Sequence, residues 1–238
     1  MIKAVFFDLD GTLLPLDEDL FIKTYFKLLS TKLEPFGYNK EDLYRVILNG
    51  IEAMYKNDDG KMTNEEVFYK CFNDFYGKEK VERDRKVIDE FYLNEFKLLK
   101  STCKDNPLAK EIIEFCKSKN LFVGLSTNPF FPKVATLTRM GFVDLKEEDF
   151  NFVTTYEDNY YCKPNPKYFL ALLEKYNLKS EEVILFGNND YEDGECSLAI
   201  GMKCYLVDGC IINKPNTKHK FEVVKMEEVI PMIEKYIG

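Results

Sequence analysis

Histidine is scarce in this chain of 238 residues, which contains only His219, in a polar stretch rich in lysine. Serine–histidine hydrolysis, histidine-rich zinc sites and histidine phosphotransfer therefore have almost no side chains to work with. Cysteine supplies no motif either, because the seven cysteines are odd in number and none forms a Cys-x-x-Cys pair. We interpret them as reduced thiols, buried or half-buried, of a cytoplasmic protein.

Long apolar runs and clustered positive charge are also missing. No apolar stretch approaches the roughly 20 residues of a membrane helix. The run at the N-terminus stops at Asp8, which does not suit a signal peptide. The formal net charge of −8 argues against a surface that binds nucleic acid. We therefore expect neither a membrane nor a nucleic acid as partner.

The chain does have enough apolar sequence for a large core. Hydrophobic residues make up 45% of it and aromatic residues 15%, so it is not a disordered chain. Its length allows one large domain or a core with an insertion.

The N-terminal part predicts one strand followed by helices. The apolar run from Ile2 to Phe7 is typical of a buried strand, and no strand pattern follows between Pro15 and Leu99. Apolar residues instead recur at helical spacing, with expected helices at 17–33, 41–55, 63–75 and 81–98. We expect these helices to form an inserted bundle that buries its own apolar stripes.

Beyond residue 99, strands and helices alternate. The expected strands are 121–127, 152–156, 183–186 and 203–207, with 203–207 as the final strand. The expected helices are 107–120, 131–140, 167–176, 193–200 and 226–236, where Pro231 should kink the last helix or delay its start. The alternation predicts an α/β fold with a parallel sheet, helices on both faces and ligands at the carboxyl ends of the strands.

The end of the first strand carries the most informative residues. Asp8 and Asp10 lie one residue apart, where two carboxylates are costly unless they hold a cation or share a proton. Gly11 lets the chain turn away, and Thr12 can hydrogen-bond back to a carboxylate or to the backbone. This composition indicates a metal and phosphoryl site; the alternative is an acidic turn with both carboxylates solvated.

The Asp-x-Asp-Gly-Thr stretch resembles the first motif of the haloacid dehalogenase-like (HAD) superfamily, most of whose members are magnesium-dependent phosphatases. The resemblance implies that Asp8 attacks phosphorus and that Asp10 serves as general acid and then as base. It also implies that Mg²⁺ binds the carboxylate of Asp8 and the backbone carbonyl of Asp10. Dehalogenases of the family usually lack the second acid, so Asp10 favours phosphoryl transfer.

Two further motifs follow in the family's order. Thr127 ends a predicted strand where the second motif has Ser or Thr, and Asn128 follows it, so we expect both to bind phosphate. Ser126 is the alternative one register away, but it should point to the opposite face. Lys163 begins Lys-Pro-Asn-Pro, which resembles the third motif and implies a lysine that stabilises transition-state charge. Alone, these residues could be an ordinary turn and an exposed loop lysine.

The fourth motif departs from the family pattern. Many members have Gly-Asp and a second acid four or five residues later, whereas here Asn188 takes the first acidic position and Asp193 fits the second. Because a hard cation also accepts an amide oxygen, we expect Asn188 and Asp193 to complete the metal site, with Asp193 bound directly or through water. Asp193 could equally be a helix N-cap, and Asp190 is a substitute ligand. The missing charge should weaken metal binding.

These motifs together predict a HAD-like hydrolase with a parallel-sheet, Rossmann-like α/β core at 1–14 and 99–238. Residues 15–98 are expected to form an α-helical cap that closes over the site. The predicted activity is Mg²⁺-dependent hydrolysis of a small phosphate monoester, with a phosphorylated metabolite as the partner. The alternatives are a dehalogenase or phosphomutase on the same core, and a non-catalytic protein that binds a phosphate ligand. The substrate, the specificity residues in the cap and the oligomeric state are not predicted.

Overall fold

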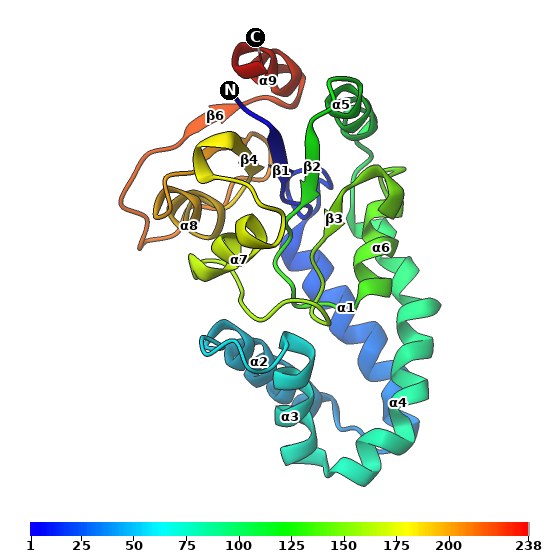
Figure 1. Ribbon diagram of the computed structural model, residues 1–238. Helices are drawn as coiled ribbons and strands as arrows, with labels where there is room; N and C mark the ends of the chain where they lie inside the picture. The colour runs from blue at the N-terminus through cyan, green and yellow to red at the C-terminus, as the bar shows by residue number, and fades with distance from the viewer. Residues whose placement is uncertain (238) are drawn as a thin grey trace.

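The computed structural model describes residues 1–237 and is built on one parallel sheet with helices on both faces (Figure 1). The strand order is β3-β2-β1-β4-β5-β6, and every pair of neighbours is parallel. The strands are β1 (Ala4–Phe7), β2 (Phe122–Leu125), β3 (Phe152–Val153), β4 (Val183–Gly187), β5 (Lys203–Val207) and β6 (Glu222–Val224). The predicted α/β fold is confirmed.

The central strand β1 contributes side chains to the apolar cores on both faces of the sheet. Its four residues are all buried, and successive side chains point to opposite faces. Val5 and Phe7 pack with α5 (Pro107–Ser118), α6 (Lys133–Gly141) and α9 (Val229–Ile237). Ala4 and Phe6 pack with α7 (Lys167–Lys175) and α8 (Cys196–Leu198) on the other face. A strand covered on both sides reads as a continuous apolar run, which is why it was easy to predict.

A group of helices lies beyond the carboxyl ends of the strands, in the lower part of Figure 1. They are α1 (Glu18–Leu33), the short 3-10 helix η1 (Glu34–Phe36), α2 (Lys40–Tyr55), α3 (Asn64–Tyr76), α4 (Lys78–Leu93) and the 3-10 helix η2 (Glu95–Thr102). We call α1 to η2 the helical segment. Its apolar stripes form a separate cluster, in which Leu43, Phe91 and Phe96 are fully buried.

Local side-chain chemistry sets where these helices begin. The Asp17 side chain accepts a hydrogen bond from the Leu20 amide at the start of α1, and Asn39 does the same for α2. Thr63 and Glu66 form a capping box at the start of α3. None of the helices in the described part of the chain combines the length and apolar character of a membrane span.

Several expected element bounds are wrong. The prediction that 203–207 is the final strand missed β6, a three-residue edge strand with two exposed residues and no alternating pattern. The helix expected at 81–98 ends at Leu93, and the chain continues as η2. The strand expected at 152–156 contains only two residues.

Three smaller segments complete the chain. A π-helical turn at Asp190–Glu195 precedes α8, so the helix expected at 193–200 begins earlier and is irregular. Pro231 lies in the first turn of α9, which starts later than expected, after the 3-10 turn η6 (Met226–Glu228). The remaining 3-10 turns are η3 (Glu147–Asp149) and η4 (Ser180–Glu182).

Candidate active site

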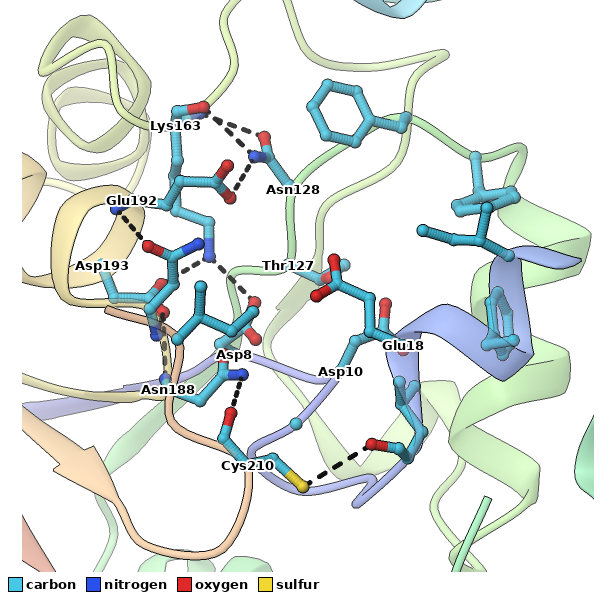
Figure 2. A pocket seen from close by; sticks show the side chains of 18 of the residues that line it. Asp8, Asp10, Glu18, Thr127, Asn128, Lys163, Asn188, Glu192, Asp193 and Cys210 are labelled. Atoms are coloured by element: carbon cyan, nitrogen blue, oxygen red, sulfur yellow. Dashed lines mark hydrogen bonds and ion pairs between the residues drawn. The ribbon is translucent and has the colours of Figure 1, made fainter. Parts of the chain in front are cut away.

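The site lies where three neighbouring strands end at the same edge of the sheet. Phe7, the last residue of β1, is in register with Leu125 of β2 and with Phe186 of β4. The residues that follow these strands are therefore neighbours in space, and a cavity of about 560 Å³ opens between them and helices α1 and α2. Seven residues proposed from the sequence line this cavity: Asp8, Asp10, Thr127, Asn128, Lys163, Asn188 and Asp193 (Figure 2).

Lys163 joins two carboxylates at the centre of the site. Its Nζ lies 2.8 Å from Asp8 Oδ1 and 2.6 Å from Asp193 Oδ1, and all three side chains are buried. Burial disfavours the lysine charge, but Asp193 and Asp8 outweigh it and raise the pKa of Lys163 well above its ordinary value. Burial raises the pKa of Asp8 to about 7, against the lowering influence of Lys163. The lysine is thus held charged beside Asp8.

Asp193 supports the strand end on its other side. Its Oδ2 accepts hydrogen bonds from the backbone amides of Asn188 and Asn189, each at 3.1 Å. Gly187 makes room for it, because a Cβ there would lie 2.3 Å from Asp193 Cγ. The alternative that Asp193 is a helix N-cap is wrong: the Asn189 side chain accepts from the Tyr191 and Glu192 amides.

Asn188 is oriented by the loop that follows β5. Its Nδ2 donates to the Cys210 carbonyl at 2.8 Å, which leaves the amide Oδ1 available to another group. Gly11, with φ +79°, passes so close that a Cβ there would lie 2.1 Å from Asn188 Nδ2. Asp190 has a different role, since its Oδ1 accepts from the Lys214 amide and the Thr217 hydroxyl and so holds that loop.

Asp10 has a partner that the sequence analysis missed. Arg139, in the last turn of α6, forms an ion pair with Asp10 Oδ2 and is only 1% exposed. Burial raises the pKa of Asp10, while Arg139 and Lys163 lower it. The sequence did contain an indication of this partner, because helical spacing places Arg139 on the same buried face of α6 as Ala135 and Thr136. A charged residue on an otherwise apolar helix face indicates a buried partner.

The side chains of Asn128 and Ser126 bond to backbone groups, although Asn128 also lines the cavity. The Asn128 amide donates to the Lys163 carbonyl and accepts from the Lys163 N–H, both at 3.1 Å, so it fixes the lysine's backbone. A phosphate contact from Asn128 would therefore come from its backbone. The Ser126 hydroxyl donates to the Phe7 carbonyl, at 3.3 Å. Of the two alternatives Ser126 and Thr127, Thr127 is the one that lines the cavity.

Glu192 is a second residue that the sequence analysis did not single out. One carboxylate oxygen accepts from the Tyr55 hydroxyl of α2 at 2.7 Å, and the other accepts from Asn128 Nδ2 at 2.8 Å. Burial raises the pKa of Glu192, and the hydrogen bond from Tyr55 opposes this effect. Through Tyr55, Glu192 links the helical segment to the sheet side of the cavity, and Figure 2 shows its contact with Asn128.

The donor set is compatible with a hard cation, although it is sparse. In the described residues 1–237, no three His, Cys, Asp or Glu side chains come together as a metal cluster. The groups at hand are the second oxygen of Asp8 and the amide oxygen of Asn188, both oxygen donors of the kind that Mg²⁺ prefers. Asp193 has both oxygens engaged by Lys163 and by two backbone amides.

The parallel sheet, with three aspartates, a lysine and a threonine gathered at its strand ends under the helical segment, makes this an α/β protein with a charged site at that edge. The family model of haloacid dehalogenase-like hydrolases matches residues 2–195. The chain belongs to this family, as the motifs around Asp8 and Lys163 predicted. The predicted enzyme class, a hydrolase of the phosphatase type, is also confirmed.

Known proteins resemble the chain over most of its length. A phosphorylated carbohydrates phosphatase of Thermotoga maritima is 26% identical over 241 residues, which cover 99% of this chain and 100% of that protein. Pyrophosphatase PpaX of Bacillus cereus is 28% identical over 193 residues, 80% of this chain and 76% of that protein. The structure of a 2-haloacid dehalogenase from Pseudomonas syringae pv. Tomato aligns at a TM-score of 0.68 with 16% identity, covering 99% and 100%, and this likeness shows the fold alone.

Proposed function

We propose that the protein hydrolyses a small phosphate monoester in a Mg²⁺-dependent reaction through an aspartyl-phosphate at Asp8. The observation that carries the proposal is the buried lysine bridge, in which Lys163 lies 2.8 Å from Asp8 and 2.6 Å from Asp193 at the floor of the cavity. A fixed positive charge beside a carboxylate nucleophile suits an anionic substrate, whose charge would otherwise repel Asp8. The phosphatases among the relatives agree with this chemistry.

In the proposed reaction a carboxylate oxygen of Asp8 attacks phosphorus and the bond between phosphorus and the leaving oxygen breaks. Asp10 gives a proton to that oxygen; burial raises the pKa of Asp10 and so eases uptake of this proton, while Arg139 opposes it. Water then attacks the phosphorus of the aspartyl-phosphate and gives a proton to Asp10, the bond between phosphorus and the Asp8 oxygen breaks, and inorganic phosphate leaves with the Asp8 carboxylate regenerated. Thr127 and Lys163 bind the phosphoryl oxygens, and Arg139 is a positioning residue for Asp10.

Mg²⁺ would be held by Asp8, the amide oxygen of Asn188 and the backbone carbonyl of Asp10, and would neutralise charge on the phosphoryl group. Asp193 contributes by orienting Asn188 and Lys163, because its carboxylate accepts hydrogen bonds from the backbone N–H of Asn188 and from the ammonium group of Lys163.

We further propose that residues 15–98 act as a cap on the core formed by 1–14 and 99–238. Tyr55, which reaches Glu192 from α2, would help to keep that cap closed.

The test is release of inorganic phosphate from a panel of phosphorylated metabolites and an aryl phosphate, with Mg²⁺ and with chelator. We expect turnover that requires Mg²⁺ and that falls at least a thousandfold in Asp8→Asn. The substituted protein should stay folded, because Asp193 still pairs with Lys163. Turnover by Asp8→Asn at the wild-type rate would exclude the mechanism. Transfer of phosphate to a second substrate hydroxyl would instead indicate a phosphomutase.

A further inference from the structure

The cavity wall that helices α1 and α2 supply is mostly apolar. Helix α1 contributes Phe21, Ile22 and Phe26 to this wall, and helix α2 contributes Leu48 and Ile51. Ile22 and Leu48 are each 41% exposed and line the same cavity, so they present apolar surface that a ligand could cover. Covering them with apolar atoms of a ligand would remove this surface from water.

The charges around the cavity are unfavourable for a ligand with a second anion. Among the lining residues that α1 and α2 supply, the charged one is Glu18, and Glu192 faces the cavity from the sheet side. Two of the lining cations are already neutralised, since Lys163 pairs with Asp8 and Asp193, and Arg139 pairs with Asp10. Within residues 1–237, Lys214 is the lining cation without a carboxylate partner, and it lies exposed on the sheet side.

From this distribution we infer that the leaving group of the substrate is an apolar alkyl or aryl alcohol that carries no second anionic group. The inference rests on the proposed phosphatase function and names its substrate class. A second phosphate or a carboxylate would meet an apolar wall and the Glu18 and Glu192 carboxylates. The polar groups on the α1 and α2 wall are the Glu18 carboxylate and the Tyr25 and Tyr55 hydroxyls. Both hydroxyls already pair within the protein, with Tyr92 and with Glu192, so most hydroxyl groups of a sugar would lack partners there. The chain would therefore differ in substrate from the relatives named for carbohydrate phosphates and for pyrophosphate.

The first measurement is a calorimetric titration of the protein with non-hydrolysable phosphonates in the presence of Mg²⁺. We expect the Kd to fall by about fourfold for each methylene from methyl- to hexylphosphonate, as burial of successive apolar groups requires. Phosphonoacetate, which carries a carboxylate, should bind no more tightly than methylphosphonate. A Kd that does not change with chain length, or an absence of binding by every phosphonate, would overturn the inference.

A charge placed on the apolar wall provides the matched test. Leu48→Lys should raise the Kd of hexylphosphonate at least tenfold and lower the Kd of phosphonoacetate, because it replaces apolar surface with a positive charge. The substitution should be tolerated, because Leu48 is partly exposed and a lysine fits there. Asn49→Lys adds the same charge one residue further along α2, at an exposed position that does not line the cavity, and should change neither Kd. Tightest binding of phosphonoacetate by the wild type, lost in Lys214→Met, would show that a second anion is recognised, contrary to the inference.

Hydrolysis of the matching esters separates this inference from the proposed function. We expect kcat/KM for alkyl phosphates to rise with chain length and to exceed that for pyrophosphate and for glucose 6-phosphate. Efficient Mg²⁺-dependent hydrolysis of pyrophosphate in preference to alkyl phosphates would support a phosphatase and refute the apolar leaving group. Chain-length-dependent binding of phosphonates with no hydrolysis of any ester would refute the phosphatase and retain the apolar ligand class.

Discussion

Arg139 is a fully charged side chain that is 1% exposed, and its anionic partner is Asp10. Its remaining contacts are a hydrogen bond to the Thr136 hydroxyl at 3.2 Å and the face of the Phe131 ring. Removing the anion alone leaves a buried guanidinium uncompensated. We expect Asp10→Leu to lower the free energy of unfolding by about 3 kcal/mol, measured by urea denaturation.

The double variant Asp10→Leu/Arg139→Met is the control for this prediction. It removes both charges, so most of the stability should return, giving a coupling energy of about 2 kcal/mol or more in the double-mutant cycle. Additive losses in the cycle would mean that the Asp10–Arg139 pair does not contribute to stability. Asp10→Asn keeps an oxygen acceptor for Arg139 and should cost less than Asp10→Leu.

Asn188 is the residue at which a gain in metal binding would cost stability. Asn188→Asp adds a carboxylate to the proposed Mg²⁺ site and should tighten Mg²⁺ by about tenfold in a calorimetric titration. The same substitution replaces the Nδ2–H that donates to the Cys210 carbonyl with an oxygen. Without metal, the variant should therefore be about 1–2 kcal/mol less stable to urea. Unchanged Mg²⁺ affinity would place Asn188 outside the metal site.

At the scale of elements, α4 contains a buried carboxylate whose ionisation stabilises the helix. Asp84 is 2% exposed, receives two hydrogen bonds from Arg83 at 2.8 and 2.9 Å, and lies 3.0 Å from Lys80. Arg83 and Lys80 lower the pKa of Asp84 to about 2, against the effect of burial. A lowered pKa in the folded state contributes stability above the unfolded pKa of about 4, which is lost as the pH falls toward 2.

The expected consequence is a pH-dependent effect of Asp84→Asn. At pH 7 the variant should be on the order of 1–2 kcal/mol less stable than the wild type, with the smaller end of this range reflecting the solvent that screens Arg83. Urea denaturation of both proteins at a series of pH values should show that the difference in stability shrinks between about pH 4 and pH 2. Asp89→Asn, at an exposed position of the same helix, should change stability by about 0.5 kcal/mol or less at any pH. A constant difference for Asp84→Asn would contradict the assignment.

Elements that depend on local chemistry were predictable from the sequence, and those that depend on distant partners were not. The capped helices α1 and α3 and the buried strand β1 follow from residues within a few positions of each other. The motif residues converge because parallel strands end at one edge. By contrast, Arg139 and Asp10 are 129 residues apart, and Tyr55 and Glu192 are 137 apart, so no periodicity joins them. The edge strand β6 owes its form to pairing with β5.

At the scale of the whole molecule, the helical segment and the sheet are joined on two sides. Where the chain enters and leaves the segment, Leu16 and Cys103 form an antiparallel bridge. On the other side, the buried Asn64 donates through its backbone to the Asn159 carbonyl, at 2.8 Å. Phe131, which follows β2, enters the apolar cluster of the helical segment. These contacts couple the two parts energetically.

We therefore predict that the whole chain unfolds in one cooperative transition. Leu43 is fully buried in the cluster of the helical segment, and Leu43→Ala should cost about 3 kcal/mol. The loss should appear equally in helix content, followed by far-ultraviolet circular dichroism, and in tyrosine fluorescence, with the calorimetric and van't Hoff enthalpies equal. Val123→Ala, in β2, provides the matched substitution in the sheet and should move the same single transition. If Leu43→Ala instead split unfolding into two steps, with the sheet melting at the wild-type temperature, the segment would be an independent folding unit, and Phe131 and Asn64 would be contacts without cooperative effect.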